Sequence, residues 1–116
     1  MNSLNSILIE GNLTADPDSK ILPSGSTVCT FTVAFAHFYQ QDQGLEKDIS
    51  YFEVEAWAKL GQTCSDTLKK GWCVRVIGRL KQDHWTDIEG KLHSKVKIVA
   101  EHVEFKPVRS EAQSAP

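Results

Sequence analysis

The stretch from Ser26 to His37 constrains the fold more than any other part of the chain, because apolar and polar side chains alternate along it. Phe31, Val33 and Phe35 fall on one face, and threonine and alanine residues fall on the other. Successive side chains of a β-strand point to opposite faces of a sheet. We therefore predict a long strand with one face in a hydrophobic core, which makes this a β-sheet protein.

Four more segments have the composition or the alternation of strands, and turn residues separate them. They cover residues 5–12, 50–57, 72–83 and 92–105. Gly90 marks the tip of a hairpin between the last two segments. A short polar link is predicted between the turn sequences Asp16-Pro17 and Pro23-Ser24-Gly25, and a long loop is predicted over the polar residues 38–49.

One segment, Lys59–Lys70, departs from the β pattern. Leu60, Cys64 and Leu68 are four residues apart and share one helical face, and Gly71 suits the end of a helix. Five strands with one helix between the third and the fourth is the order of an OB-fold. We predict an all-β, five-stranded OB-fold barrel with one α-helix between strands 3 and 4. It covers residues 1–106, and residues 107–116 are predicted to be a short flexible C-terminal tail.

The net charge of the chain hides an uneven distribution. Its 13 Lys and Arg residues and 15 Asp and Glu residues leave a formal charge of −2, which gives no support to a polybasic, histone-like protein. Residues 1–58 hold eight acidic and two basic residues, whereas residues 59–97 hold nine basic and four acidic residues. A local positive surface is therefore compatible with the acidic average, and so is a mixed, solvated surface.

Two large aromatic residues stand on the polar face of the third predicted strand. Its core face consists of the apolar side chains at every second position, Phe52, Val54 and Ala56. Tyr51 and Trp57 then lie on the opposite face with Glu53 and Glu55. Two interpretations are open. The rings cover the barrel rim or a subunit interface, or they form a platform on which nucleobases stack, at about 1–3 kcal/mol per base.

The last two predicted strands supply positive charge. Counting by two from Arg75 places Arg79, Lys81, Asp83 and Trp85 on the outer face, while Val74, Val76 and Leu80 take the inner positions. Across the hairpin, Lys95 and Lys97 project outward. Cations interleaved with aromatic rings on a curved sheet match what a single-stranded nucleic acid needs. A β-bulge at Gly78 would shift this register.

Other chemistries find no support in the sequence. The four histidines and three cysteines show neither zinc-ligand spacing nor a CxxC pair, so we expect free thiols, no metal site and no cofactor. Phosphate-binding and nucleophile motifs are missing, so we expect neither an enzyme nor a catalytic residue. The sequence also lacks a signal peptide and an apolar run of about 18 residues, which predicts a cytoplasmic protein without a membrane partner.

Several short motifs, in one order along residues 5–105, resemble the bacterial single-stranded DNA-binding proteins. They are Asn5–Pro17, Leu22–Gly25, Phe31–Ala34, Trp57–Leu60, Leu68–Gly71 and Gly78–Leu80. Each motif is weak alone, but together and in order they are specific. The resemblance implies an OB-fold subunit of a homotetramer that coats single-stranded DNA in replication, recombination and repair, in the cytoplasm and associated with the nucleoid.

The resemblance also suggests site residues. Tyr51 and Trp57 match the aromatic stacking positions of the third strand, Trp85 matches one in the later hairpin, and Tyr39 or its neighbour Phe38 matches one at the end of the second strand. Family cation positions fall at or near Lys20, Lys59, Arg79 and Lys81. Together with the charged strand faces, the predicted phosphate contacts are Lys20, Lys59, Arg75, Arg79, Lys81, Lys95 and Lys97.

The chain departs from the family pattern at three places. Glu55 stands where an apolar residue is usual, and Asp83 stands where a basic or polar residue is common, so the DNA face is expected to be less positive than in relatives. Family members usually continue into a Gly/Pro/Gln-rich segment with an acidic, apolar tip that recruits replication and repair proteins. This sequence stops at Ser110–Pro116, which predicts a short form without the acidic C-terminal tail.

Three functional hypotheses follow. The first is sequence-independent binding and protection of single-stranded DNA by aromatic stacking and basic phosphate contacts on a homotetramer of OB-folds. The second is an accessory or primosomal OB-fold subunit that acts mainly through protein contacts, which Glu53 and Glu55 favour slightly. The third, an RNA-binding OB-fold of the cold-shock type, predicts similar stacking, but the sequence lacks the Phe-rich strand motifs of that family.

Overall fold

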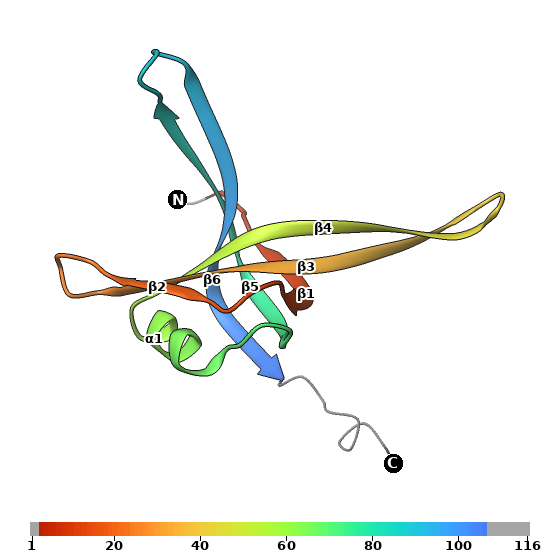
Figure 1. The fold of residues 1–116 in the computed structure, drawn as a ribbon, viewed down its shortest axis with the longest axis horizontal. Coiled ribbons are helices and arrows are strands. Elements are labelled where there is room, and N and C mark those ends of the chain that lie inside the picture. Colours follow the sequence, from red (N-terminus) through yellow and green to blue (C-terminus); the bar gives the residue numbers. More distant parts are fainter. Residues whose placement is uncertain (1–2, 107–116) are drawn as a thin grey trace.

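Six strands and one helix make up residues 3–106, the part of the chain that the computed structural model describes (Figure 1). In chain order they are β1 (Ile7–Leu13), β2 (Asp18–Ile21), β3 (Thr27–Gln41), β4 (Gly44–Trp57), α1 (Ala58–Thr67), β5 (Cys73–Thr86) and β6 (Leu92–Lys106). The predicted tail, residues 107–116, lies outside the described residues.

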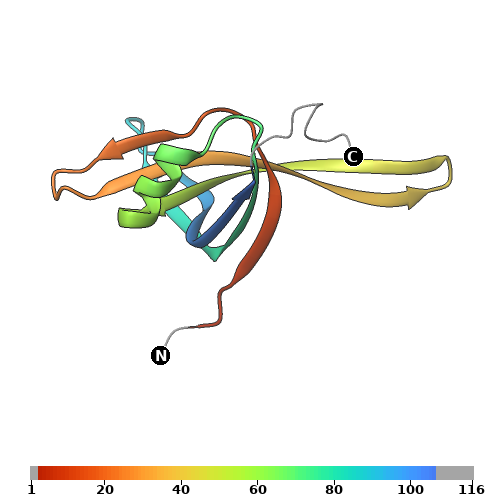
Figure 2. The ribbon, with the colours of Figure 1, turned by 90° about the horizontal axis from the view of Figure 1, so that it is seen from below.

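The sheet closes on itself. Its strand order is β1-β5-β6-β4-β3-β2, and β1 also pairs with β3 at Asn12 and Leu13. The five strands β1, β3, β4, β5 and β6 therefore form the barrel, with α1 between the third and the fourth of them (Figure 2). The predicted fold class, an OB-fold barrel with this helix position, is confirmed.

The short strand β2 is not in the prediction, which had a polar link there. It pairs antiparallel with β3 from Asp18↔Thr30 to Ile21↔Thr27, and its four residues are all exposed. Because neither face of β2 enters the core, its side chains show no apolar alternation. Its backbone hydrogen bonds with β3 define it as a strand, and backbone hydrogen bonds do not require a particular side-chain pattern.

The core lies inside the barrel and consists of the predicted inward faces. Phe31 and Val33 of β3 meet Val54 of β4 and Ile98 of β6 there, all at most 3% exposed. Phe35 and Phe52 pack at its margin with ring centroids 5.9 Å apart. Alternation therefore identified the buried faces of β3 and β4, because only one parity of a barrel strand points inward.

The helix closes one end of the barrel, where Cys64 and Leu68 are buried. A side chain at Gly61 would place its Cβ 2.4 Å from the Ala56 carbonyl oxygen, so glycine lets the helix lie directly on the end of β4. The predicted helix end at Lys70 is wrong. The helix ends at Thr67 because Leu68 turns extended, with ψ 147°, to bury its side chain.

Two of the three thiols lie in the barrel core, and the third, Cys73, is partly exposed. Cys29, Cys64 and Cys73 are free, as predicted, and the first two are buried. Burial raises the pKa of Cys29 to about 11 and the pKa of Cys64 to about 12. Both thiols are therefore protonated near neutral pH. A protonated, buried thiol packs as a small apolar group.

Two hairpin arms project from the barrel (Figure 1). The predicted loop at residues 38–49 is wrong, because these residues form the outer part of the β3–β4 arm. The two strands pair without interruption from Val28↔Trp57 to Gln41↔Gly44, and a two-residue turn joins them. Most side chains there are exposed on both faces. The polar composition that suggested a loop is thus compatible with a strand pair held by its backbone ladder.

The β5–β6 arm has its tip at Gly90, as predicted. Asp87 caps the turn, since its Oδ1 atom accepts hydrogen bonds from the backbone N–H groups of Glu89 and Lys91, both at 2.9 Å. Leu80, assigned to the core by parity, is 43% exposed, because β5 has begun to leave the barrel there.

No helix within residues 3–106 has the length and apolarity that crossing a bilayer takes.

A bulge does occur opposite Gly78, and the additional residue lies on the partner strand β6. Ile77 pairs with His102 and Gly78 pairs with Ala100, so Glu101 of β6 bulges out of the ladder. A Cβ atom at Gly78 would lie 2.2 Å from the Val99 carbonyl oxygen. Glycine therefore permits the close approach of β5 and β6 next to the bulge.

Candidate nucleic-acid interface

One outer face of the barrel combines aromatic rings with charged side chains. Tyr51 and Trp57 of β4 point outward, as predicted, and are 62% and 44% exposed. The register places Ala34 beside Tyr51 and Val28 beside Trp57, so small neighbours on β3 leave the rings uncovered. An aromatic ring whose neighbours on the sheet face have short side chains can accept a planar ligand on its exposed side.

A groove of about 380 Å³ runs beside Trp57. Strands β4, β5 and β6 all contribute to its lining, which consists of Glu55, Trp57, Arg79, Lys81, Lys97, Val99 and Ala100. Three of the seven predicted phosphate contacts therefore come together next to one predicted stacking residue. An aromatic wall with three cations along one groove suits a polyanion that carries planar bases.

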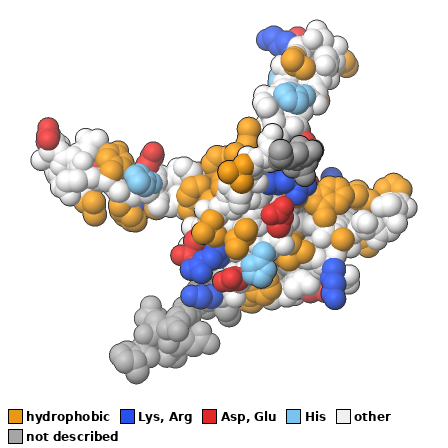
Figure 3. Space-filling view, turned by 180° about the vertical axis from the view of Figure 1, so that it is seen from behind, with side chains coloured by type: hydrophobic (Ala, Val, Ile, Leu, Met, Phe, Trp, Pro, Cys, Tyr) orange, Lys and Arg blue, Asp and Glu red, His pale blue; other side chains and the backbone are white. Residues whose placement is uncertain are grey.

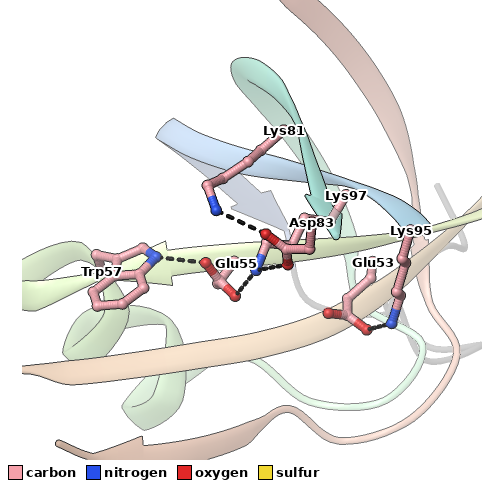
Figure 4. A network of polar contacts seen from close by, with 7 residues as sticks. All are labelled: Glu53, Glu55, Trp57, Lys81, Asp83, Lys95 and Lys97. Carbon is pink, nitrogen blue, oxygen red and sulfur yellow. Dashed lines mark hydrogen bonds and ion pairs between the residues drawn. The ribbon is translucent and has the colours of Figure 1, made fainter. Parts of the chain in front are cut away.

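The charges of this face form a connected network (Figure 4). Lys97 Nζ lies 2.6 Å from Glu55 Oε2 and 2.8 Å from Asp83 Oδ2. Lys81 Nζ lies 2.7 Å from Asp83 Oδ1. On the adjoining part of the face, Lys95 Nζ lies 2.6 Å from Glu53 Oε1. The three lysines thus meet three carboxylates that come from β4 and β5.

Ionisation in the network follows from these contacts. Hydrogen bonds from Lys81 and Lys97 hold the pKa of the Asp83 carboxyl at about 2. Burial lowers the pKa of Lys97, but hydrogen bonds to Asp83 and Glu55 outweigh it, so the net pKa of Lys97 is raised. Both groups are therefore charged across the physiological pH range.

The network also holds Trp57. Its indole Nε1–H donates a hydrogen bond to Glu55 Oε1 at 2.7 Å, while the other oxygen of that carboxylate pairs with Lys97. An indole bonded in this way keeps one orientation on the surface and loses little rotamer freedom when a ligand arrives.

One predicted cation, Arg75, lies away from the groove. Arg75 is held by Glu10 at 3.0 Å and Glu104 at 3.7 Å, and it lines a separate hollow of about 280 Å³. Arg79, at the groove, pairs with Glu101 at 3.5 Å.

The outer face of β4, β5 and β6 that holds the groove is called the groove face. Two predicted lysines flank it. Lys20 of β2 is exposed and pairs with Val28, which in turn pairs with Trp57, so Lys20 shares the face of Trp57 two strands away. Lys59 is exposed at the start of α1, two residues after Trp57. Both lysines therefore lie near one end of the groove face.

Aromatic residues occupy both arms as well. Of the two alternatives on β3, Phe38 lies on the strand face of Tyr51 and is 59% exposed, whereas Tyr39 lies on the opposite face, stacked on His37 at 6.4 Å. Trp85 on the other arm stacks on His93 at 5.5 Å, and His93 Nε2 lies 2.7 Å from Asp87 Oδ2.

Two features of this surface are not among the predictions made from the sequence. One is the pairing of each groove lysine with a carboxylate, and the other is the Trp85–His93–Asp87 contact at the hairpin. The signal for the second was present, because Trp85 and His93 are directly opposite in the hairpin register that Gly90 defines. Figure 3 shows the mixed character of the surface, with acidic and basic side chains beside apolar ones on the barrel.

Comparison with known proteins places this geometry in context. The model of the single-strand binding protein family matches residues 4–106. The single-stranded DNA-binding protein of Aquifex aeolicus is 39% identical, over 96% of this chain and 77% of its own length. The single-stranded DNA-binding protein 2 of Listeria innocua is 33% identical, over 97% of this chain and 70% of its own length. These relatives are named for binding and not for catalysis.

Solved structures agree on the fold. A Plasmodium falciparum SSB in complex with ssDNA superposes with a TM-score of 0.81 at 23% identity, covering 94% of this chain and 98% of that one. A deletion mutant of the single-stranded DNA binding protein from Thermus aquaticus gives a TM-score of 0.79 at 26% identity, covering 95% of this chain and 53% of that one. With its barrel, its outward aromatic residues and a match over residues 4–106, this chain belongs to the single-strand binding protein family.

Proposed function

We propose that this protein binds single-stranded DNA, without sequence preference, on the face that holds the groove. The observation that carries the proposal is Trp57, exposed and fixed beside Arg79, Lys81 and Lys97. Relatives that share the family are named for this activity, which supports it. In the cell, the protein would cover exposed strands in the cytoplasm during replication, recombination and repair.

The proposed path of the strand follows the exposed rings. Bases stack on Trp57 and Tyr51, and further bases stack on Phe38 or Tyr39 of one arm and on Trp85 of the other. Phosphates pair with the cations between and beside these rings, which are Lys20, Lys59, Arg79, Lys81, Lys95 and Lys97. Arg75 has its carboxylate partners in a separate hollow, so it is at most a peripheral contact.

Titration with oligo-dT, followed by tryptophan fluorescence, tests this proposal. Stacking of thymine on Trp57 and Trp85 is expected to quench the emission, and binding is expected to weaken as salt is raised. Duplex DNA of equal length serves as the control, because its bases are not free to stack. Equal affinity for the duplex would contradict the proposal, and a marked preference for RNA of the same sequence would favour the cold-shock type of function.

We also propose that the chain assembles with copies of itself, as a homotetramer. Within residues 3–106, Ile7–Gly11 pair with β5 alone, since β3 reaches β1 only at Asn12 and Leu13. An unpaired strand edge is a template for a second strand. Beside it lies an apolar hollow of about 320 Å³, lined in part by Ala34, Phe35 and Ile49. Copies related by a two-fold axis would pair this edge symmetrically.

Measurement of the mass in solution tests the assembly. A homotetramer is expected to have four times the 13.0 kDa of one chain. A mass of two chains would keep the strand pairing and contradict the tetramer, whereas a mass of one chain would contradict both.

The second candidate, an accessory subunit that acts through protein contacts, is favoured by one observation. The carboxylates Glu53, Glu55 and Asp83 neutralise the lysines of the groove face, which lowers its attraction for DNA. Binding of oligo-dT that does not respond to salt, together with specific capture of replication proteins, would support this candidate.

A further inference from the structure

The cations that line the groove, and Lys95 beside them, already have carboxylate partners before any ligand arrives. Lys81, Lys95 and Lys97 each have a carboxylate oxygen within 2.8 Å. Arg79, the remaining cation of the groove, has Glu101 at 3.5 Å. Figure 4 shows one chain of contacts, from Trp57 through Glu55, Lys97 and Asp83 to Lys81, and a separate pair between Lys95 and Glu53.

We propose that Glu53, Glu55 and Asp83 are affinity-setting residues, which occupy on the free protein the places that DNA phosphates take in the complex. The inference rests on the proposed function and adds how the site is tuned. A carboxylate and a phosphate are both anionic oxygen acceptors, and they compete for the same ammonium donors. A phosphate that enters the groove therefore competes with these carboxylates for the lysine ammonium groups, most directly at Lys97, which already holds two of them.

Lys97 is the point where this competition is strongest. Its side chain is only 12% exposed, and it already donates to two carboxylates. A phosphate that approached Lys97 with both carboxylates in place would meet two like charges at short range. Like charges in a partly desolvated site repel strongly, so binding requires the carboxylates to turn away.

The Trp57 ring is coupled to the displacement of the carboxylates from Lys97. Glu55 accepts the hydrogen bond of the Trp57 indole through one oxygen and holds Lys97 through the other. If a phosphate draws Lys97 away, Glu55 loses one of its two partners. A base on Trp57 and a phosphate on Lys97 therefore share one connecting carboxylate, and the two contacts are not independent.

Salt dependence is the distinguishing signature of this arrangement. DNA binding releases cations from phosphates, and the logarithm of affinity falls with the logarithm of salt by about 0.7 for each phosphate neutralised on a single strand. Carboxylates that lose their lysine partners take up cations from solution, which opposes that release. The wild-type protein should therefore have a shallower salt dependence than a variant in which these carboxylates are absent.

The test uses the double variant Glu53→Gln/Asp83→Asn, which leaves the bond between Glu55 and Trp57 in place. Both amides keep an oxygen that can accept from lysine, so the fold is expected to persist, as thermal unfolding would verify. We expect oligo-dT affinity at low salt to rise roughly threefold to tenfold. We also expect a steeper dependence of affinity on salt.

The control is Asp42→Asn/Asp66→Asn, which changes net charge equally at two exposed sites outside the network. A rise in affinity and slope for the network variant alone supports the inference. An equal rise in both variants, or no rise in either while the wild type binds, overturns it and leaves the proposed function standing. Absence of oligo-dT binding by the wild type and the network variant alike would overturn the proposed function itself.

Discussion

Replacing Trp57 by alanine is expected to weaken the binding of oligo-dT by about 1–3 kcal/mol, or roughly 5- to 150-fold. The indole is 44% exposed beside the groove cations, so its ring is available to one base. Its removal leaves the pair between Lys97 and Glu55 intact, because that pair uses the other carboxylate oxygen. The substitution leaves the net charge of the groove unchanged, so the loss reports the ring together with its hydrogen bond to Glu55, and the phenylalanine control separates the two.

Anisotropy of a dye-labelled oligo-dT is the measurement for this variant, because the substitution removes one of the fluorescent tryptophans. Trp57→Phe is the matched control, since it keeps a ring at the position and loses only the indole hydrogen bond. We expect it to retain most of the affinity. Unchanged affinity of the alanine variant would mean that the strand follows another face of the barrel.

Replacing Phe31 by alanine is expected to lower the free energy of unfolding by about 3–5 kcal/mol. Phe31 is 3% exposed and packs inside the barrel with the buried residues of β4 and β6. A loss of this size is a large part of the 5–15 kcal/mol that typically holds a domain together. Urea unfolding, followed by circular dichroism, measures it.

The same strand offers a matched control of identical chemistry. Phe38 lies on β3 as well, but on the arm, where it is 59% exposed. Phe38→Ala is expected to change the free energy of unfolding by no more than about 0.5 kcal/mol. Its expected effect is on DNA affinity instead. Equal destabilisation by the two substitutions would contradict the division of β3 into a core half and an exposed arm.

The barrel could be predicted because its strands have two different environments. Phe31, Val54 and Ile98 recur at the parity that faces a core, and a period of two is the pattern that a half-buried strand produces. The same period placed Tyr51 and Trp57 outside. β2 and the outer half of the β3–β4 arm have no such contrast, since both of their faces meet solvent. Their strands depend on backbone pairing, which any polar sequence can make.

The helix illustrates a different limit. Its existence follows from the spacing of Leu60, Cys64 and Leu68, but its end does not. Leu68 fits the helical period and yet leaves the helix to fill the barrel end, where it is 2% exposed. Packing of one large side chain outweighed one more turn of helix, and periodicity carries no information on that choice.

The sequence by itself determined the fold class, the inward and outward faces of β3 and β4 and the candidate stacking residues, because parity along an unbroken strand depends only on local backbone geometry. The tertiary structure decided which charges meet. Lys97 contacts Glu55 across 42 positions of sequence because β4 and β6 lie side by side and parallel, a pairing that closure of the barrel produces. Electrostatic partners depend on distances between strands, and those distances exist only once the sheet has closed.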